Sequence, residues 1–105
     1  MPQLTSDEFD FYEDFTEEYQ SSFFTMPLDF LKAVDKVMYT GQTEPILSTF
    51  SPQPGTRDYY LLENLTKLFQ LLEMKLRKWN FPNLHDNVLS LLDILAPKIA
   101  YRNLN

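Results

Sequence analysis

The chain has 105 residues, 44% of them hydrophobic and 23% charged, which indicates one domain with a modest core. It contains no cysteine, and this excludes a disulfide framework, a cysteine nucleophile and thiolate metal sites. The net charge of −6 is concentrated in residues 1–24, which hold seven acids and no Lys or Arg, whereas residues 25–105 hold eight acids and nine bases.

The first predicted element is a helix over about residues 6–20. Thr5 and Glu8 have the spacing of a capping box, in which the two residues satisfy each other's backbone N–H groups. Aromatic residues follow at helical spacing, at Tyr12, Phe15 and Tyr19. Residues 1–24 carry seven of the sixteen aromatic residues, which is unusual for a disordered acidic tail. We refer to residues 1–24 as the acidic arm and expect it to be helical.

The second predicted helix begins near Pro27, a residue favoured in the first turn, and stops at Gly41. Its apolar face is formed by Phe30, Leu31, Val34, Val37 and Met38. Residues 44–50 predict a short helical turn, and the Pro- and Gly-containing residues 51–56 predict a loop.

Two longer helices complete the prediction, over about residues 58–79 and from Asn83 onward. The first has a main apolar stripe of Leu61, Leu65, Leu68, Leu72, Leu76 and Trp79, which Leu62, Phe69 and Leu71 widen. In the second, Asn83 is the expected N-cap and Pro97 is expected to end or kink the helix. The resulting fold class is all-α: a compact bundle of four main helices with a short additional helical turn, in a single helical domain over 1–105.

The residues that catalysis or metal binding needs are scarce. His85 is the only histidine, and a lone histidine in the first turn of a helix is far more often a surface residue than a general base, because a catalytic histidine needs an orienting partner and a nucleophile nearby. Zinc sites need several His or Cys ligands, and the isolated Gly41 and Gly55 form no phosphate-binding loop. We therefore expect a protein that is not an enzyme, with no cofactor and no metal.

Location and membrane association are predicted from signals that the sequence lacks. The first residues show neither the basic nor the apolar stretch of a signal peptide, and the apolar run 88–92 is too short to span a bilayer. These features predict an intracellular protein, cytoplasmic or nuclear, that does not bind membranes.

The acidic arm predicts the function best. Acidic side chains speed the encounter with a basic partner, and aromatic side chains fill pockets on it. We expect a protein–protein interaction domain, an adaptor or regulatory subunit, whose partner has a basic or apolar groove. The expected partner-binding residues are Phe11, Tyr12, Glu13, Phe15, Glu17 and Glu18. An LxxLL pattern at 68–72 lies in a leucine-rich helix and is interpreted as core.

Three alternatives remain open at this point. The acids of the arm suit an inhibitor that mimics nucleic acid and blocks a basic channel of a DNA- or RNA-processing protein. Binding of nucleic acid itself is not expected, because the molecule is acidic. The abundant Leu and Phe residues are also compatible with a homo-oligomer. Finally, the arm can act as a latch that docks on a basic patch of Lys75, Arg77 and Lys78 in the free protein.

Overall fold

A computed structural model describes residues 3–23 and 26–100, and the regular structure within them is entirely helical. In chain order, the elements are α1 (Ser6–Glu18), α2 (Gln20–Phe23), α3 (Leu28–Thr40), the 3₁₀ turn η1 (Pro45–Leu47), α4 (Arg57–Leu76) and α5 (Pro82–Ala100). Four long helices and a short additional turn confirm the predicted all-α class.

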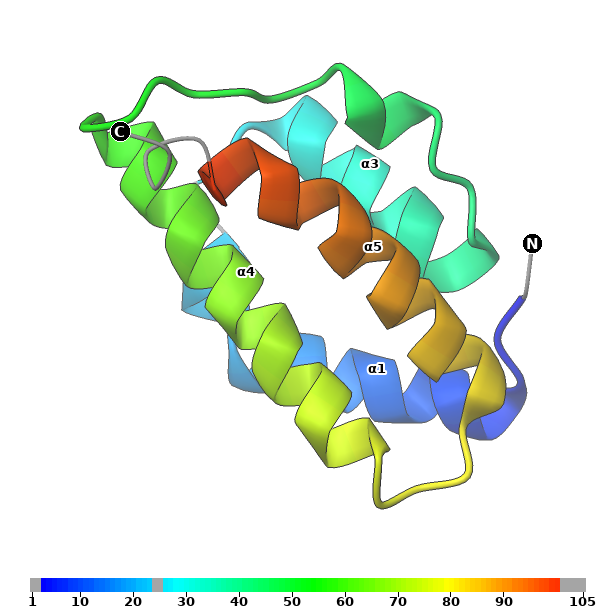
Figure 1. The fold of residues 1–105 in the computed structure, drawn as a ribbon. Helices are drawn as coiled ribbons and strands as arrows, with labels where there is room; N and C mark the ends of the chain where they lie inside the picture. Colours follow the sequence, from blue (N-terminus) through cyan, green and yellow to red (C-terminus); the bar gives the residue numbers. More distant parts are fainter. Residues whose placement is uncertain (1–2, 24–25, 101–105) are drawn as a thin grey trace.

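The long helices pack in a bundle that α1 crosses at one end (Figure 1). Helices α4 and α5 lie side by side and run in opposite directions, and α3 packs against α5. Helix α1 passes across the end of the bundle where α4 finishes and α5 begins. The Cα radius of gyration is 13.4 Å, close to the value of about 13 Å expected for a compact chain of this length.

The caps of the first three long helices follow from local sequence. The backbone N–H of Glu8 donates to Thr5 Oγ1 at 3.3 Å and the N–H of Thr5 donates to Glu8 Oε1 at 2.9 Å, which confirms the capping box. Gly41 ends α3 with φ 78°, a left-handed conformation that glycine adopts without strain. Thr56 caps α4 by accepting the N–H of Tyr59 at 3.2 Å.

Several helix ends differ from the prediction. Helix α4 ends at Leu76, so the apolar spacing that extends to Trp79 continues beyond the helix. Helix α5 begins at Pro82, because a proline in the first turn loses no helical hydrogen bond, and Asn83 therefore lies inside the helix and is not its N-cap. Helix α5 also continues past Pro97 to Ala100, which excludes the prediction that Pro97 ends it.

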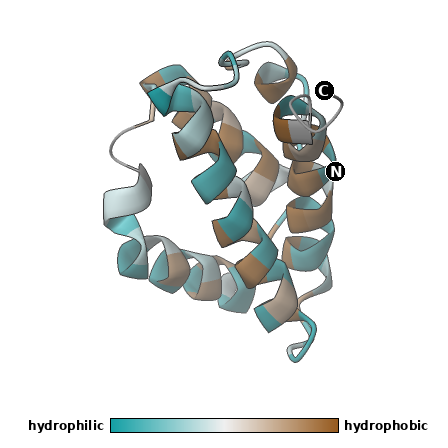
Figure 2. Cartoon of the chain, turned by 60° about the vertical axis from the view of Figure 1, so that its left-hand side comes forward, coloured by the Kyte–Doolittle hydropathy of each residue, from teal (hydrophilic) through white to brown (hydrophobic). Residues whose placement is uncertain are grey.

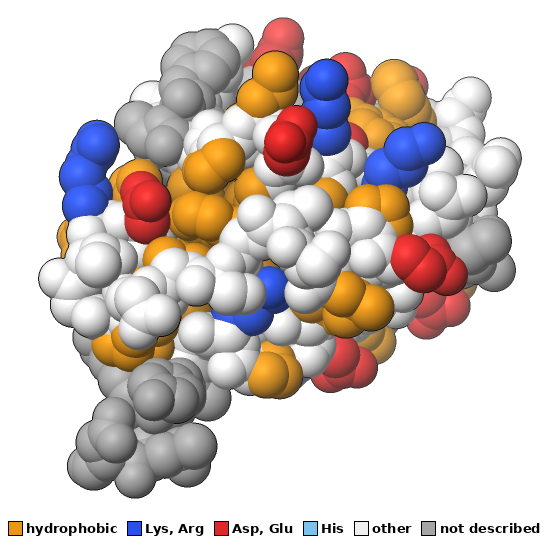
Figure 3. Space-filling model, turned by 90° about the horizontal axis from the view of Figure 1, so that it is seen from above, with side chains coloured by type: hydrophobic (Ala, Val, Ile, Leu, Met, Phe, Trp, Pro, Cys, Tyr) orange, Lys and Arg blue, Asp and Glu red, His pale blue; other side chains and the backbone are white. Residues whose placement is uncertain are grey.

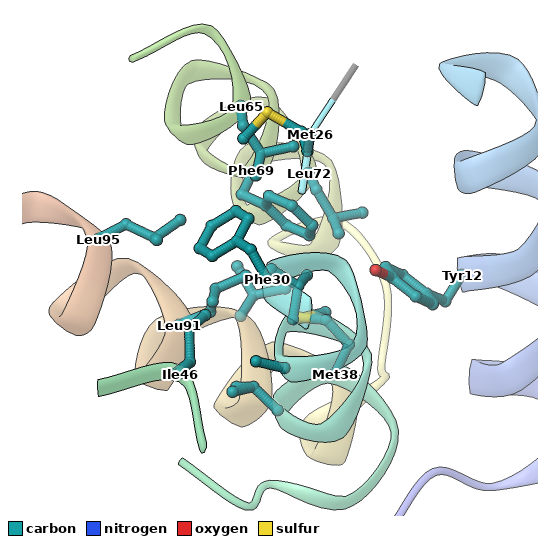
Figure 4. Close-up of a cluster of buried hydrophobic side chains, with 14 of the residues drawn as sticks. Tyr12, Met26, Phe30, Met38, Ile46, Leu65, Phe69, Leu72, Leu91 and Leu95 are labelled. Atoms are coloured by element: carbon teal, nitrogen blue, oxygen red, sulfur yellow. The ribbon is translucent and has the colours of Figure 1, made fainter. Parts of the chain in front are cut away.

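The core lies where the inner faces of α3, α4 and α5 meet, and α1 closes it from one end. The hydropathy colouring of the ribbon in Figure 2 shows the apolar stripes of the helices, and Figure 4 shows Phe30, Phe69, Leu72 and Leu91 converging. These four side chains are fully buried. The predicted stripe of α4 is only partly buried, because Leu71 is 38% exposed and Trp79 is 59% exposed.

Polar side chains connect the helices around this core. The Nδ2 of buried Asn87 on α5 donates to the carbonyl of Met38 on α3 at 2.9 Å. Glu73 on α4 is buried and receives hydrogen bonds from the guanidinium of Arg77 at 2.8–3.1 Å, while Nε2 of His85 on α5 lies 2.8 Å from its Oε2. The bonds from Arg77 and His85 lower the pKa of Glu73 to about 2.

Candidate functional site: the groove between α1 and α4

Glu8 fixes the position of α1 on the bundle. Its side chain is 1% exposed, although it belongs to the most acidic segment of the chain. One carboxylate oxygen accepts the backbone N–H of Leu84 at 2.7 Å, and the other accepts Nδ2 of Asn83 at 3.0 Å. Glu8 therefore caps α1 and also satisfies the N-terminus of α5, where a negative charge is favoured by the helix dipole.

The charge on Glu8 is stabilised by these contacts. Burial alone raises the pKa of this carboxyl, but the hydrogen bonds from Thr5, Leu84 and Asn83 outweigh burial and hold the pKa below its usual value. An ionised carboxylate with several donors is tolerated in a buried position, whereas an unpaired one is not. Glu8 therefore acts as a structural anchor for the arm.

The inward face of α1 is aromatic. Tyr12 is fully buried, its ring lies 5.3 Å from that of Tyr39 in an edge-to-face arrangement, and Figure 4 shows it pointing from α1 into the core cluster. The ring of Phe15 lies 6.0 Å from that of Phe69 on α4. These contacts turn one face of α1 toward the core and direct the next face toward α4.

Between α1 and α4 lies an open apolar groove, which we call the α1–α4 groove. It encloses about 470 Å³. It is lined from α1 by Phe11, Asp14, Phe15 and Glu18, and from α4 and the turn after it by Leu71, Met74, Lys75, Lys78 and Trp79. Met74 is 58% exposed, so large apolar side chains face solvent here.

The two rims of the groove carry opposite charges. Asp14 and Glu18 form the α1 rim, and Lys75 and Lys78 form the α4 rim. The Nζ of Lys75 lies 5.9 Å from the centre of the Tyr19 ring, a cation–π contact between the two sides. The groove is therefore bordered by acids along one edge and by bases along the other.

The predicted charge latch takes a different form in the structure. Arg77 is engaged by Glu73 of its own helix. Within residues 3–23 and 26–100, no ion pair joins an acid of the arm to Lys75 or Lys78. The arm does dock beside this basic patch, but aromatic packing and the Glu8 cap hold it there.

A larger hollow of about 640 Å³ lies under the loop before α4, but it is a weaker candidate site. Lys98 lines it and is already engaged, since its Nζ donates to the carbonyl of Phe50 at 2.8 Å and lies 3.0 Å from Oγ of Ser51. Burial lowers the pKa of this lysine. Figure 3 looks onto the end of the molecule that this loop covers, where hydrophobic, acidic and basic side chains are interspersed without a single-sign patch.

A third hollow, of about 280 Å³, is acidic and lies between α1 and α3. Tyr39 donates its hydroxyl to Glu13 there. Burial, followed by the charge of Glu13, raises the pKa of Asp35. In the part of the chain that the structure describes, no three His, Asp or Glu side chains are grouped as a metal ion would need.

The structure divides the six predicted contact residues among three environments. Phe11 and Glu18 line the α1–α4 groove. Glu13 and Glu17 face the acidic hollow on the other side of α1. Tyr12 is fully buried in the core, whereas Phe15 is 5% exposed and lies where the core meets the α1–α4 groove. The six residues span two turns of helix, and successive positions in a helix point in directions about 100° apart.

The prediction missed the contribution of α4 to the site. Leu71 and Trp79 were assigned to the core stripe, and Met74 to no surface. A signal is present in the sequence, because Tyr60, Asn64, Lys67, Leu71, Met74 and Lys78 follow a four–three spacing and all face solvent. That row becomes informative only when the inner face of α4 is known.

No model of a known protein family, no curated protein sequence and no solved structure matches this chain. None of the helices in the described ranges combines the length and apolar character needed to cross a bilayer.

Proposed function

We propose that this protein is a non-enzymatic protein–protein interaction module, an adaptor or regulatory subunit, that binds an amphipathic helix of its partner in the α1–α4 groove. The observation that carries the proposal is the apolar lining of half-buried Phe11 and exposed Leu71, Met74 and Trp79 between two oppositely charged rims. Binding of an amphipathic helix in an apolar groove is a common mode of peptide recognition.

The outer face of α4 supports a helical occupant. Its exposed row from Tyr60 to Lys78 repeats every three or four residues, which is the spacing at which a second helix can pack against it. Leu71 and Met74 provide the apolar centre of that row. Methionine adapts its shape to different side chains, which suits a binding surface.

The rims define the chemistry of the partner helix. Basic residues along one edge of its apolar stripe would face Asp14 and Glu18, and acidic residues along the other edge would face Lys75 and Lys78. This complementarity fixes how the helix is rotated about its axis, and it disfavours partners with one sign of charge on both edges.

The proposal can be tested with a display library of amphipathic peptides of about 18 residues, or five helical turns. The apolar stripe is fixed as leucine and the flanking positions are randomised. We expect the full-length protein to select basic residues on one edge and acidic residues on the other. Binding of the selected peptides is then measured by the fluorescence of Trp79, the single tryptophan of the chain.

Two variants provide a matched comparison. Leu71 lies in the groove and is 38% exposed, whereas Leu89 on α5 is 42% exposed and does not line the groove. Leu71→Glu should weaken peptide binding by about tenfold or more, because it places a charge in the apolar contact. Leu89→Glu should leave binding unchanged. Equal effects of the two substitutions would place the binding surface elsewhere.

The alternative of a nucleic-acid mimic rests on the exposed acids of α1, namely Asp7, Asp10, Glu13, Asp14, Glu17 and Glu18. Salt distinguishes the two functions, because a mimic binds through charge and an apolar groove does not. The selected sequences can be used to identify a partner protein. If its affinity falls steeply between low and high salt and Leu71→Glu has no effect, the mimic is favoured.

A further inference from the structure

Three aromatic rings meet at one end of the α1–α4 groove, beyond the apolar centre formed by Leu71 and Met74. Phe11 of α1 lies 5.2 Å from Phe81 and 6.1 Å from Trp79, measured between ring centres. Trp79 and Phe81 are nearly parallel, with an interplanar angle of 8° and centres 6.1 Å apart. We call these three residues the aromatic cluster.

The outermost ring of the cluster is unusually exposed. Trp79 is 59% exposed, whereas Phe11 and Phe81 are half-buried. A ring this large normally buries most of its surface, so an exposed tryptophan that rests on two other rings is an informative feature. The half-buried rings support Trp79 in a fixed position and leave part of its surface open to solvent.

Two acidic residues lie on the α1 side of the cluster. Asp14 lines the groove together with Phe11 and Trp79. Asp7 lies one helical turn before Phe11 and is exposed. The positive groups, Lys75 and Lys78, line the α4 rim. A cation that approaches the cluster is therefore favoured from the α1 side and disfavoured from the α4 side.

We infer that the aromatic cluster is a subsite for an arginine side chain of the partner helix. The guanidinium stacks on the exposed surface of Trp79 and donates hydrogen bonds to the carboxylate of Asp14. This inference rests on the proposed function, since it specifies a residue of the helix that the groove binds. It also fixes the direction of that helix, because the cluster marks only one end of the groove.

Arginine fits this subsite better than other side chains. A guanidinium is planar, stacks on aromatic rings and presents several donors to a carboxylate, whereas an ammonium is a compact and strongly hydrated point charge. The cluster does not enclose a ligand as a cage for methylated lysine would. Two van der Waals contacts between ring planes need about 7 Å, more than the 6.1 Å between Trp79 and Phe81, so the binding surface is the outer one.

The test uses synthetic amphipathic peptides with a leucine stripe, in which one position on the edge facing α1 is varied. At that position the peptides carry arginine, its neutral isostere citrulline, lysine or proline, and the position is moved along the edge by one turn at a time. Affinities for the full-length protein are measured by calorimetry. At one end of the scan, arginine should bind about three- to tenfold more tightly than citrulline and also more tightly than lysine.

Variants of the protein then locate the preference. Trp79→Leu keeps an apolar side chain but removes the ring, and Asp14→Asn removes the charge at constant shape; either should reduce the arginine-to-citrulline ratio toward one. Glu17→Gln is the control, because it removes the same charge from α1 but lies outside the groove. It should keep the ratio. In the wild-type complex, the arginine side-chain protons should shift upfield in NMR spectra through the Trp79 ring current.

The outcomes separate the two proposals. A preference for arginine that is lost in Trp79→Leu and kept in Glu17→Gln supports the subsite. Tight binding of the leucine-stripe peptides with equal affinity for arginine and citrulline overturns the subsite and leaves the proposed function standing. A proline peptide that binds best would also overturn it, because an extended segment would then occupy the cluster. If none of the peptides binds, both proposals fail together.

Discussion

The inward side of α1 and the side that faces the groove differ in how much of the surrounding side-chain surface is buried. On the inward side, Glu8 and Tyr12 are buried against α5 and α3, and the carboxylate of Glu8 has three donors. On the side facing α4, the groove leaves Met74 and Trp79 more than half exposed. One face of α1 is thus fully packed within the fold, whereas the other borders a groove that is open to solvent.

This difference separates stability from binding. Side chains that are fully packed and hydrogen-bonded stabilise the native state, and their removal is costly. Exposed apolar side chains contribute little to the stability of the fold, but their burial by a partner stabilises the complex. We therefore expect substitutions on the inward side to affect unfolding and substitutions in the groove to affect binding.

The largest expected effect contrasts two phenylalanines of α1. Phe15→Ala should lower the free energy of unfolding by about 3–5 kcal/mol, because it leaves a cavity against Phe69. Phe11→Ala should cost less, about 1–2 kcal/mol, because Phe11 is half-buried and its surroundings can collapse or hydrate. Urea unfolding of both variants measures the contrast, and equal losses would show that the two faces of α1 contribute alike.

Glu8 and Asp7 provide the next comparison, between two adjacent acids of the arm. Glu8→Ala removes a carboxylate that accepts bonds from Thr5, Asn83 and Leu84, and it should cost about 2–3 kcal/mol of stability. Asp7→Ala removes an exposed acid in the first turn and should cost less than about 1 kcal/mol. Urea unfolding at neutral pH tests the difference. Similar values would mean that Glu8 acts only through its charge at the start of α1.

Local sequence signals predict most of the fold, but they do not predict the contact between Glu8 and the N-terminus of α5. The capping box at Thr5 and the stop at Gly41 depend on neighbouring residues alone, and both are present as predicted. The second role of Glu8 depends on the N-terminus of α5, which is 76 residues away in the chain. No local pattern can indicate which of seven acids in the arm is buried there.

The groove was hidden for a similar reason. Apolar spacing predicts that α4 is amphipathic, but it cannot show where α1 stops covering the helix. Trp79 has the sequence spacing of the inner stripe, but α4 ends at Leu76 and the turn after it places Trp79 at the surface. Phe11 and Glu18 were identified as binding candidates from α1 alone. The residues of α4 that form the opposite wall of the groove can be identified only from the tertiary structure.

The charge state of Glu8 predicts how stability depends on pH. The pKa of Glu8 is lowered in the folded protein, so folding favours its ionised form. Its contribution is fully present above the unfolded pKa of about 4.3 and is lost as pH falls through the lower folded pKa. Glu73, with a pKa of about 2, acts in the same direction. Stability should therefore decline between about pH 5 and pH 2.

The variants Glu8→Gln and Glu73→Gln sharpen this expectation. Each removes one titrating carboxyl, so the decline in the urea midpoint between pH 5 and pH 3 should be shallower in each variant than in the wild type. Asp35, whose pKa is raised by burial and by Glu13, acts in the opposite direction and offsets part of the decline. An unchanged slope in Glu8→Gln would show that the hydrogen bonds to this carboxyl persist after protonation.

The inward face has one incomplete contact, the hydroxyl of Tyr12. This oxygen is buried and has no hydrogen-bond partner within residues 3–23 and 26–100. Tyr12→Phe removes an unsatisfied polar group and keeps the ring, so it should raise the free energy of unfolding by about 1 kcal/mol. Thermal unfolding at neutral pH measures the change. A loss of stability would instead indicate that the hydroxyl is hydrogen-bonded in solution.

The smallest effect on folding is expected in the groove itself. Met74 is 58% exposed, so Met74→Ser should change the free energy of unfolding by no more than about 0.5 kcal/mol. The same substitution should weaken binding of the selected helical peptides several-fold, because it removes apolar area from the centre of the contact. Leu28→Ser, at 64% exposure on α3 and outside the groove, is the control for both measurements.

The two readouts for Met74 decide whether the open face of α1 and α4 serves binding. Loss of affinity without loss of stability is the pattern of a surface that the fold does not need. A loss of stability as large as that of Phe11→Ala would mean that Met74 packs in solution and that the groove is closed in the free protein. Binding a helix would then require the groove to open first, and the cost of opening would lower the measured affinity.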